Sequence, residues 1–565
     1  MIEIPVDMMR ATIGDRRRVM VFAALFAAVS AQNASSGSSQ TCEALSVDNI
    51  SPLVVKAEYA VRGRLLARAM ELEAVLKAGG DAAAALPFKR IVRCNIGNPQ
   101  AVGQKPTTFV RQVLSLVMNP AQLSGLSKWA YPKDAIARAK HYLAGIPSLG
   151  AYSDSQGIMS VRKEVADFIA ARDGHPASPS DIFLTDGASA GVKALMQLLV
   201  RGPHDAVLVP VPQYPLYSAV TTLLNGTLAP YYLDEDAAWG VQEAELRRAL
   251  TAAKAGGATT RALCVINPGN PTGQSLPRAA VESILRFAAK EKLVLMADEV
   301  RTRRRRAIRR AIRRAIRRAI RRALLSRSPP PLRSAQVYQE NVYGDAPPFV
   351  SFKKVLSEMA AAGDAAAGGV QLVSFHSTSK GFFGECGLRG GYFEMVNVDA
   401  EVRAQLLKLA SISLCSNTVG QLATGLMVRP PAKGEPSHKT YAKERAAILA
   451  GLAARAQRIA AALNALPGVT CNAAEGAMYL FPRVRLPKAA VAAAAKQGMA
   501  ADEYYSIKLL EATGLVVVPG SGFKQVEGTH HFRTTFLPPA DMLDEVLPKL
   551  ATFHTDFIAQ HGGAK

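Results

Sequence analysis

Five short apolar segments of strand length, separated by amphipathic stretches, constrain the fold of this chain more than any other feature. Helix-like stretches such as LRRALTAAKA and VESILRFAAKEK lie between the segments. Apolar strands that alternate with helices are typical of a mostly parallel sheet covered on both faces. We therefore predict an α/β fold. The five segments are residues 182–186, 206–212, 262–268, 293–299 and 372–377.

The composition suits a large enzyme. The chain has 565 residues, of which 49% are hydrophobic, enough for one large α/β domain and a smaller one. No uninterrupted apolar stretch reaches the length of a membrane-spanning helix, so we expect no membrane partner. The six cysteines and nine histidines show no CxxC, HExxH or HxH spacing. We therefore expect reduced thiols and no metal site.

The two ends of the chain differ from the middle. Residues 16–18 are arginines, followed by VMVFAALFAAVSA and a serine-rich stretch. This pattern fits a signal peptide, a mitochondrial presequence or an unstructured extension, so we exclude residues 1–44 from the fold. We favour a mitochondrial or cytoplasmic location over secretion. From about Pro430 an alanine-rich helical pattern is followed by short strands at the C-terminal end, which indicates a second, smaller domain.

The stretch SFHSTSKGFFGECGLRGGY places a lysine where a strand enters a glycine-rich turn. Lys380 has Ser377 before it and Arg389 nine positions after it. It could be a solvated loop lysine, an anion-binding lysine or a lysine whose amine does covalent chemistry. Hydroxyls, backbone N–H groups and a guanidinium suit a phosphate, and a lysine amine in a dry pocket can form a Schiff base. Pyridoxal phosphate needs both an amine and a phosphate site.

Two other strand ends carry groups that fit such a cofactor. The sequence TDGASAG follows the apolar segment 182–186 and opens a predicted helix. Free N–H groups at the helix start could bind the phosphate through Gly187, Ala188 and Ser189, although many α/β proteins contain a similar turn. After the segment 206–212, Tyr214 could stack on a pyridine ring or could be an ordinary core tyrosine.

Three polar residues complete the predicted site. Asn270, in NPGNPTG, could reach a ring oxygen of the cofactor. Asp298 ends an apolar segment, and a buried carboxylate there needs a positive partner such as a protonated pyridine nitrogen. Arg533 lies in HFRTTF, where a bidentate guanidinium would suit the carboxylate of an amino acid.

Taken together, NPGNPTG, ADEV, STSKG, GLRGG and HFR resemble the fold-type I, pyridoxal-phosphate-dependent aminotransferases. Longer strings such as NIGNPQAVGQKPTTFVRQV and LGAYSDSQG resemble the alanine aminotransferase branch, from about Val47 to Phe557. The resemblance implies a homodimer with a large cofactor domain over residues 146–430. It also implies a smaller α+β domain built from both chain ends, residues 45–145 and 431–565.

The resemblance also implies a role for each matching residue. Lys380 would hold the cofactor covalently and later move a proton, and Asp298 would keep the pyridine nitrogen protonated. Tyr338 and Asn270 would contact the phenolic oxygen. The substrate would be bound by Gly97, Asn270 and Arg533. The implied phosphate ligands are Ala188, Ser189, Ser377, Arg389 and Tyr152 of the partner subunit.

The reaction implied by the resemblance moves the amino group of L-alanine to 2-oxoglutarate, giving pyruvate and L-glutamate. A glyoxylate or other 2-oxo acid aminotransferase is the alternative within the class. The alternative from another class is an arginine-rich nucleic-acid-binding protein on a disabled aminotransferase scaffold. We do not expect a nucleic-acid partner, because the basic charge of the chain is local.

That local charge lies in residues 300–336, which interrupt the family pattern. Fifteen arginines account for most of the net charge of +23 and leave +8 elsewhere. The segment, expected to be disordered or helical, could bind nucleic acid, form an acquired surface loop or be a translated retained intron. We favour the intron, because every valine codon begins with GT and one glutamine codon ends with AG. Removing residues 300–336 restores ADEVYQENVY.

Overall fold

The computed structural model describes residues 45–59, 63–125, 129–299 and 349–562. The N-terminal extension, the arginine-rich segment and Tyr338 therefore lie outside the described residues. The chain divides into two units, residues 1–55 and 56–565. Helix α2 (Pro52–Lys56) ends at their boundary, and everything below concerns the second unit.

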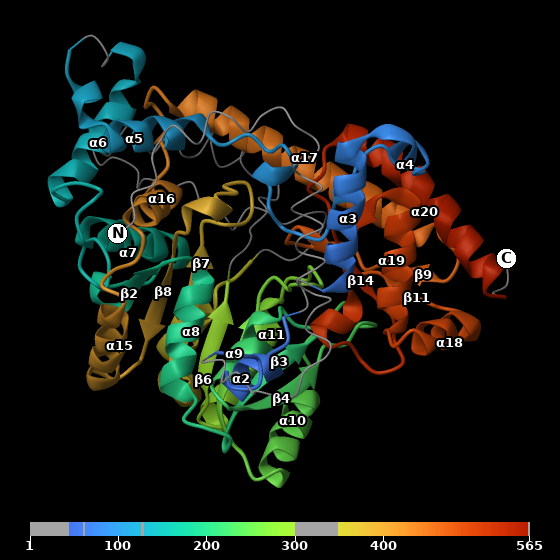
Figure 1. Cartoon of the computed structure of the whole chain (residues 1–565). Helices are drawn as coiled ribbons and strands as arrows, with labels where there is room; N and C mark the ends of the chain where they lie inside the picture. The colour runs from blue at the N-terminus through green and yellow to red at the C-terminus, as the bar shows by residue number, and fades with distance from the viewer. Residues whose placement is uncertain (1–44, 60–62, 126–128, 300–348, 563–565) are drawn as a thin grey trace, which may run out of the picture. The chain divides into compact units, whose positions relative to one another are not determined.

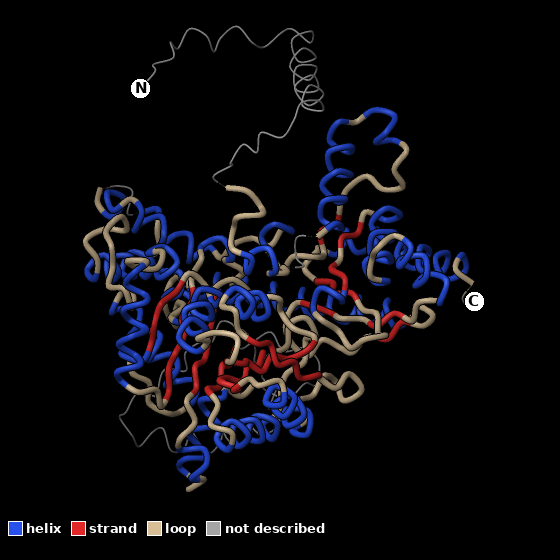
Figure 2. The backbone as a smooth tube through the Cα atoms, turned by 60° about the horizontal axis from the view of Figure 1, so that its bottom comes forward, coloured by secondary structure: helices blue, strands red, loops and turns tan. Residues whose placement is uncertain are grey.

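A seven-stranded sheet forms the centre of the second unit (Figures 1 and 2). All neighbouring strands are parallel except β8, which is antiparallel to both of its neighbours. The predicted α/β class is confirmed. In spatial order the strands are β2 (Ile182–Thr185), β8 (Gly391–Val396), β7 (Leu372–Ser377), β6 (Val294–Asp298), β5 (Thr259–Ile266), β3 (Asp205–Val211) and β4 (Thr227–Tyr232).

Five of these strands match the five predicted apolar segments within a few residues. The sequence analysis did not predict β4 and β8. Strand β4 is at the edge of the sheet and only partly buried, so it lacks a continuous apolar signal. Strand β8 returns antiparallel to β7 after a connection that contains only one turn of 3-10 helix, Cys386–Leu388.

Alternate side chains of the strands enter two apolar cores on opposite faces of the sheet. In β3, Val207 and Val209 belong to one core, and Ala206 and Leu208 belong to the other. Helices cover both faces (Figure 1). The first core includes α8 (Ala188–Leu199), α9 (Leu216–Leu223) and α15 (Ala400–Ile412). The second includes α10 (Glu243–Ala255), α11 (Arg278–Lys290), α13 (Phe352–Ala361) and α14 (Ala365–Gly368).

Four helices, together with Tyr441 of α17 (His438–Asn464), form a third core at the β2 end of the sheet. Ile182 and Leu184 of β2 are buried in it. Two of its helices fall within residues 45–145, which were predicted to belong to the smaller domain. The helices are α5 (Thr108–Met118), α6 (Lys133–Gly145), α7 (Met159–Asp173) and α16 (Thr418–Val428).

The C-terminal part has its own core, to which the N-terminal part contributes. Strand β1 (Val92–Arg93) pairs in parallel with β12 (Leu515–Val516), and Val92 and Cys94 are buried among C-terminal residues. Helix α3 (Arg64–Ala78), followed by the short α4 (Gly80–Ala84), packs on α19 (Ala501–Thr513). These contacts support a smaller domain made from both chain ends, and its boundaries stay a proposal.

The remaining C-terminal elements include the strand that carries Arg533. They are α17 (His438–Asn464), β9 (Val469–Thr470), β10 (Tyr479–Leu480), β11 (Arg483–Val484), α18 (Lys488–Lys496), β13 (Val518–Pro519), β14 (Phe532–Thr535) and α20 (Ala540–Gln560). The chain's last described element is thus the helix α20, not the expected strand. Pro548 inside that helix weakens its sequence signal.

Among the described helices, α17 is the one whose length and composition would allow it to cross a membrane. Leu452, Ile459 and Leu463 of this helix are buried in the C-terminal core. A helix in the core of a protein can have the same length and composition, so these two properties of α17 are weak evidence for a membrane span.

Candidate active site

The amine of Lys380 has an acceptor inside the protein. The turn after β7 is held by hydrogen bonds from Thr378 N to Gly390 O (3.0 Å) and from Glu385 N to Thr378 O (2.9 Å). The Lys380 Nζ donates to the carbonyl oxygen of Gly97 at 2.5 Å. This contact disfavours the simplest alternative, a lysine fully solvated on a surface loop, and it brings Lys380 and Gly97 together.

The start of α8 and Arg389 form a cradle without room for a side chain. Gly187 has φ +80° and precedes the helix, which has no side-chain cap. A Cβ at Gly187 would lie 2.7 Å from Nη2 of Arg389, which donates to the carbonyl of Asp186 at 2.7 Å. Arg389 Nη1 lies 3.4 Å from the Ser379 hydroxyl. Uncapped N–H groups beside a guanidinium suit an anion such as phosphate.

The other predicted phosphate residues have different degrees of burial. Ala188 and Ser189 begin α8 and are partly exposed. Ser377 is buried, and its hydroxyl donates to Ser379 Oγ at 3.0 Å. Tyr152, by contrast, is 77% exposed. The predicted role of Tyr152 requires a partner subunit, and the single chain does not test it.

Asp298 ends β6 between the ends of its two neighbouring strands. Its backbone pairs with Ile266 of β5 and Phe375 of β7. The buried Tyr217, at the start of α9, donates its hydroxyl to Asp298 Oδ2 at 3.1 Å. The hydrogen bond fixes one carboxylate oxygen. The sequence analysis did not single out Tyr217, although it follows Tyr214 by three positions in the same strand-to-helix turn.

Tyr214 also contacts a tyrosine that the sequence analysis did not single out. Its hydroxyl lies 2.9 Å from the hydroxyl of Tyr59. Burial raises the pKa of Tyr214 above its usual value, so the phenol stays protonated at neutral pH. Stacking of Tyr214 on a cofactor ring stays a prediction.

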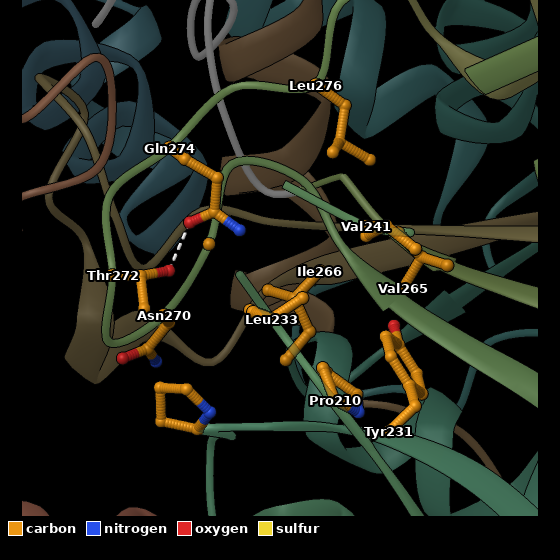
Figure 3. A pocket seen from close by; sticks show the side chains of 12 residues that line it. Pro210, Tyr231, Leu233, Val241, Val265, Ile266, Asn270, Thr272, Gln274 and Leu276 are labelled. Atoms are coloured by element: carbon orange, nitrogen blue, oxygen red, sulfur yellow. Dashed lines mark hydrogen bonds between the residues drawn. The ribbon is translucent and has the colours of Figure 1, made fainter. Parts of the chain in front are cut away.

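The loop that carries Asn270 folds over a small, mainly apolar pocket (Figure 3). Tyr231, Leu233 and Val265 line the pocket, and Thr272 donates a hydrogen bond to Gln274 within the loop. The neighbouring Asn267 has a structural role, because its side-chain oxygen accepts a bond from Leu276 N at 3.0 Å. These contacts hold the loop that places Asn270 near Arg533.

Arg533 is almost completely buried, with 3% exposure, yet its two hydrogen-bond acceptors are neutral. Nη2 donates to the carbonyl of Asn95 at 2.6 Å, and Nη1 donates to Asn270 Oδ1 at 3.1 Å. Among the described residues, Nε has no hydrogen-bond partner. Burial lowers the pKa of Arg533 from its usual value. A buried guanidinium with a spare N–H is suited to bind a carboxylate.

Two aromatic rings enclose this guanidinium. Its carbon lies 4.3 Å from the ring centre of Tyr479 and 4.8 Å from that of Phe523. These rings restrict the guanidinium and favour its charged form through cation–π attraction. Neither ring was predicted from the sequence.

Most of the predicted groups lie at the carboxyl ends of the parallel strands. They follow the ends of β2, β3, β5, β6 and β7, and Arg389 comes just before the start of the antiparallel β8. Among the described residues no group of three or more His, Cys, Asp or Glu side chains could hold a metal ion. The available chemistry is that of a lysine amine, a carboxylate and two anion-binding guanidinium groups.

Comparisons with known proteins agree with this arrangement. The sequence model of the family "Aminotransferase class I and II" matches residues 118–300 and 334–550, on both sides of the arginine-rich segment. The chain is 48% identical to the probable mitochondrial alanine aminotransferase of Dictyostelium discoideum, over 92% of this chain and 90% of that one. It is 46% identical to alanine aminotransferase 1 of Homo sapiens, over 92% and 96%.

A third relative bears a different name. The chain is 47% identical to glutamate–glyoxylate aminotransferase 1 of Arabidopsis thaliana, over 92% of this chain and 98% of that one. Among solved structures, the alanine aminotransferase of Pyrococcus furiosus has a TM-score of 0.64 at 22% identity, covering 90% and 99% of the two chains. A single mutant of the aspartate aminotransferase of Thermus thermophilus has a TM-score of 0.59 at 19% identity, covering 92% and 100% of the two chains. These two likenesses concern the fold.

Proposed function

Because the chain belongs to the class I and II aminotransferase family, we propose that it moves the amino group of L-alanine to 2-oxoglutarate, giving pyruvate and L-glutamate. The relatives named alanine aminotransferase support the choice of donor. Within this chain, the groups around Lys380 and Arg533 suit a substrate that bears both an amine and a carboxylate.

The cofactor that fits these residues is pyridoxal phosphate. The cradle of Gly187, Ala188, Ser189, Ser377 and Arg389 would hold its phosphate, and Lys380 would supply the amine for its aldehyde. When bound, the cofactor supplies a pyridine ring that takes up electrons from the substrate's Cα. Tyr214 and Asn270 would contact the ring, and Tyr152 of the partner subunit would reach the phosphate.

The roles of the protein residues follow from their chemistry. Asp298 would hold a proton on the ring nitrogen, because its carboxylate is fixed at the strand end by Tyr217. The Lys380 amine would take the proton from the substrate's Cα and return it at C4′ of the cofactor. Arg533 would bind the substrate carboxylate, next to Gly97 and Asn270. Tyr338 would contact the phenolic oxygen.

One observation carries the proposal. A single short segment accepts a hydrogen bond from each of the two key cations: Lys380 binds Gly97 O at 2.5 Å, and Arg533 binds Asn95 O at 2.6 Å. This shared segment supports the proposal that the reacting lysine and the arginine that would bind the substrate carboxylate belong to one site, as amino-group transfer requires.

The test combines turnover with chemical trapping. Protein purified with pyridoxal phosphate should form pyruvate from L-alanine and 2-oxoglutarate, and borohydride reduction should add the cofactor's mass to the Lys380 peptide. Lys380→Ala should abolish both results, whereas Lys433→Ala, which removes an exposed lysine, should preserve both. Turnover by Lys380→Ala at the wild-type rate would contradict the proposal.

A second candidate is transfer to glyoxylate, favoured by the 47% identity to the Arabidopsis glutamate–glyoxylate aminotransferase. The two candidates differ in the acceptor. Competition between equal concentrations of glyoxylate and 2-oxoglutarate, with L-alanine as the donor, decides between them. A kcat/KM at least about tenfold higher with glyoxylate would replace the first candidate.

We also infer a homodimer in the mitochondrion or cytoplasm. Tyr152, Ile412 at the end of α15 and Leu414 have exposed, mainly apolar side chains. The two segments that carry them are joined by the hydrogen bond from Ser155 Oγ to Leu414 O at 2.5 Å. An exposed apolar group of this kind suits a subunit interface. Three of the relatives are named mitochondrial. N-terminal sequencing of the mature protein would test the location.

A further inference from the structure

Glu385, in the turn that follows Lys380, ties this turn to the segment 97–111. We infer that Glu385 and Arg111 are positioning residues that set how closely the Gly97 carbonyl approaches the Lys380 amine. The inference rests on the proposed function, in which that amine moves the substrate's proton. Neither Glu385 nor Arg111 is among the residues that would touch substrate or cofactor.

The tie is made of several side-chain hydrogen bonds. Arg111 Nη2 donates to Glu385 Oε2 at 2.9 Å, and Gln100 Nε2 donates to the same oxygen at 2.9 Å. Gln100 also donates to Gly384 O at 3.1 Å, and Gln104 Nε2 donates to Phe382 O at 2.8 Å. Three side chains of one segment therefore hold three residues of the lysine turn, Phe382, Gly384 and Glu385.

The fit between the two segments leaves little space for a side chain at Gly384. This residue has φ +60°, and a Cβ there would lie 2.7 Å from Gln104 Nε2 and 3.2 Å from Pro99 Cβ. A side chain at this position would therefore displace the Gln104 amide, which is part of the tie, and crowd Pro99. The close approach requires glycine for both conformational and steric reasons.

The tie acts on the Gly97 carbonyl through the lysine turn. This oxygen accepts a hydrogen bond from Lys380 Nζ at 2.5 Å. The Cys386 thiol shares its single proton between Gly97 O at 3.6 Å and the closer Ser379 O at 2.6 Å. Cys386 follows Glu385 immediately. Movement of Glu385 would therefore shift the turn that holds both donors to Gly97.

The charge of Glu385 makes Arg111 essential to the tie. The carboxylate is only 2% exposed, whereas the Arg111 side chain is 40% exposed. Among the described residues, the second carboxylate oxygen of Glu385, Oε1, has no hydrogen-bond partner. A buried carboxylate without its cation is strongly disfavoured. Loss of Arg111 should therefore displace Glu385 toward water and loosen the turn.

The chain offers a matched control in another ion pair. Arg429 Nη1 lies 2.9 Å from Glu164 Oε1, with exposures of 55% and 5%, in the third core. Both Arg111→Gln and Arg429→Gln leave a buried glutamate without that guanidinium. Any general loss of stability should therefore appear in both variants, and an effect on the lysine turn should appear only in Arg111→Gln.

The experiment compares these two variants as holoenzymes. For Arg111→Gln we expect kcat/KM for L-alanine to fall by about tenfold, with a larger change in KM than in kcat, because substrate enters beside a looser Gly97 segment. Amide hydrogen exchange should become faster in residues 97–104. For Arg429→Gln we expect neither change. Equal effects of both variants on exchange in residues 97–104 would overturn the inference.

A double variant tests the pairing itself. Glu385→Gln combined with Arg111→Gln should lose no more activity than the more impaired single variant, because both changes remove the same interaction. Fully additive losses would overturn the pairing. If the wild-type protein fails to transaminate any amino acid, the proposed function falls, whereas the exchange comparison still decides whether the tie exists.

Discussion

The carboxylate of Glu299 accepts a hydrogen bond from the backbone N–H of Phe352 at 2.7 Å. Glu299 directly follows β6 and its catalytic candidate Asp298, and Phe352 opens α13. The residues between positions 299 and 349 lie outside the described part of the chain. The hydrogen bond therefore brings the two sides of this long segment together next to the candidate site.

The burial of Glu299 predicts a dependence of stability on pH. Burial raises the pKa of Glu299 from 4.5 to about 7, and the charge of Arg172 only partly offsets it. The folded state therefore keeps a proton that the unfolded state loses above about pH 4.5. The contribution of Glu299 to the free energy of unfolding should fall by about 3 kcal/mol as the pH rises from 4.5 to 7.

Glu299→Gln tests this prediction, because glutamine stays neutral and can still accept the bond from Phe352. In urea denaturation, the stability of the variant relative to wild type should increase between pH 5 and pH 8. Glu527→Gln, at an exposed glutamate, should show no such trend. A constant difference between Glu299→Gln and wild type across this range would show that Glu299 titrates normally.

Apolar strands were predictable from the sequence because burial on both faces leaves an uninterrupted signal. Strand β3 is buried at every position, and its predicted and observed bounds differ by one residue at each end. Strand β4 is half-exposed, and the helix α20 contains a proline, so local patterns did not reveal them. The order of the strands depends on tertiary contacts, which no local pattern specifies.

The candidate site was predictable where a residue type has few alternative uses. A lysine or aspartate at the end of an apolar strand is costly without a partner, which made Lys380 and Asp298 prominent. Tyr217 and Tyr479 were not predicted, because a tyrosine in an apolar stretch has the same pattern as a core residue. Only the fold brings their side chains to Asp298 and Arg533.

The Tyr217 hydroxyl should strengthen cofactor binding through Asp298. Tyr217→Phe removes the 3.1 Å hydrogen bond that orients the carboxylate. We expect the dissociation constant of pyridoxal phosphate to rise by about fivefold, the effect of losing one ordinary hydrogen bond. Titration of the apoprotein followed by absorbance measures this constant.

Tyr505→Phe is the matched control for that prediction. Tyr505 is also fully buried, and its hydroxyl lies 3.0 Å from His554 in the C-terminal core. The control should lose comparable stability and bind the cofactor as wild type does. If both variants bind pyridoxal phosphate equally well, the orientation of Asp298 does not depend on Tyr217.

Arg533→Lys should impair substrate binding more than folding. A lysine keeps the positive charge but loses the planar fork held between Tyr479 and Phe523. We expect the KM for L-alanine to rise by about 30-fold or more, because a charge-assisted, bidentate contact is lost. Initial-rate kinetics measure the effect, and the absorbance of bound cofactor should stay unchanged. An unchanged KM would place the substrate carboxylate elsewhere.

Ile412→Asp should disrupt the proposed homodimer. Ile412 is 77% exposed at the end of α15, so a monomer tolerates the new charge, whereas a buried subunit interface does not. Analytical ultracentrifugation should show a dimeric wild type and a mainly monomeric variant with reduced activity. Val402→Asp, at another exposed apolar position of the same helix, is the control. A fully active wild-type monomer in dilute solution would contradict the homodimer.

Deletion of residues 300–336 should tighten cofactor binding. Without them, Tyr338 stands three positions after Asp298, whereas in the present chain it stands forty positions after it. Closing a longer loop costs little entropy. The inserted segment, however, adds fifteen positive charges to the chain between Asp298 and Tyr338, two residues of the candidate site. We expect the trimmed protein to bind pyridoxal phosphate more tightly than the full chain, in the same absorbance titration.

Amplification across the junction from cellular RNA should yield mainly a product that lacks 37 codons, or 111 nucleotides. If only the longer product appears and the full chain turns over as fast as the trimmed one, residues 300–336 are a genuine loop of the enzyme.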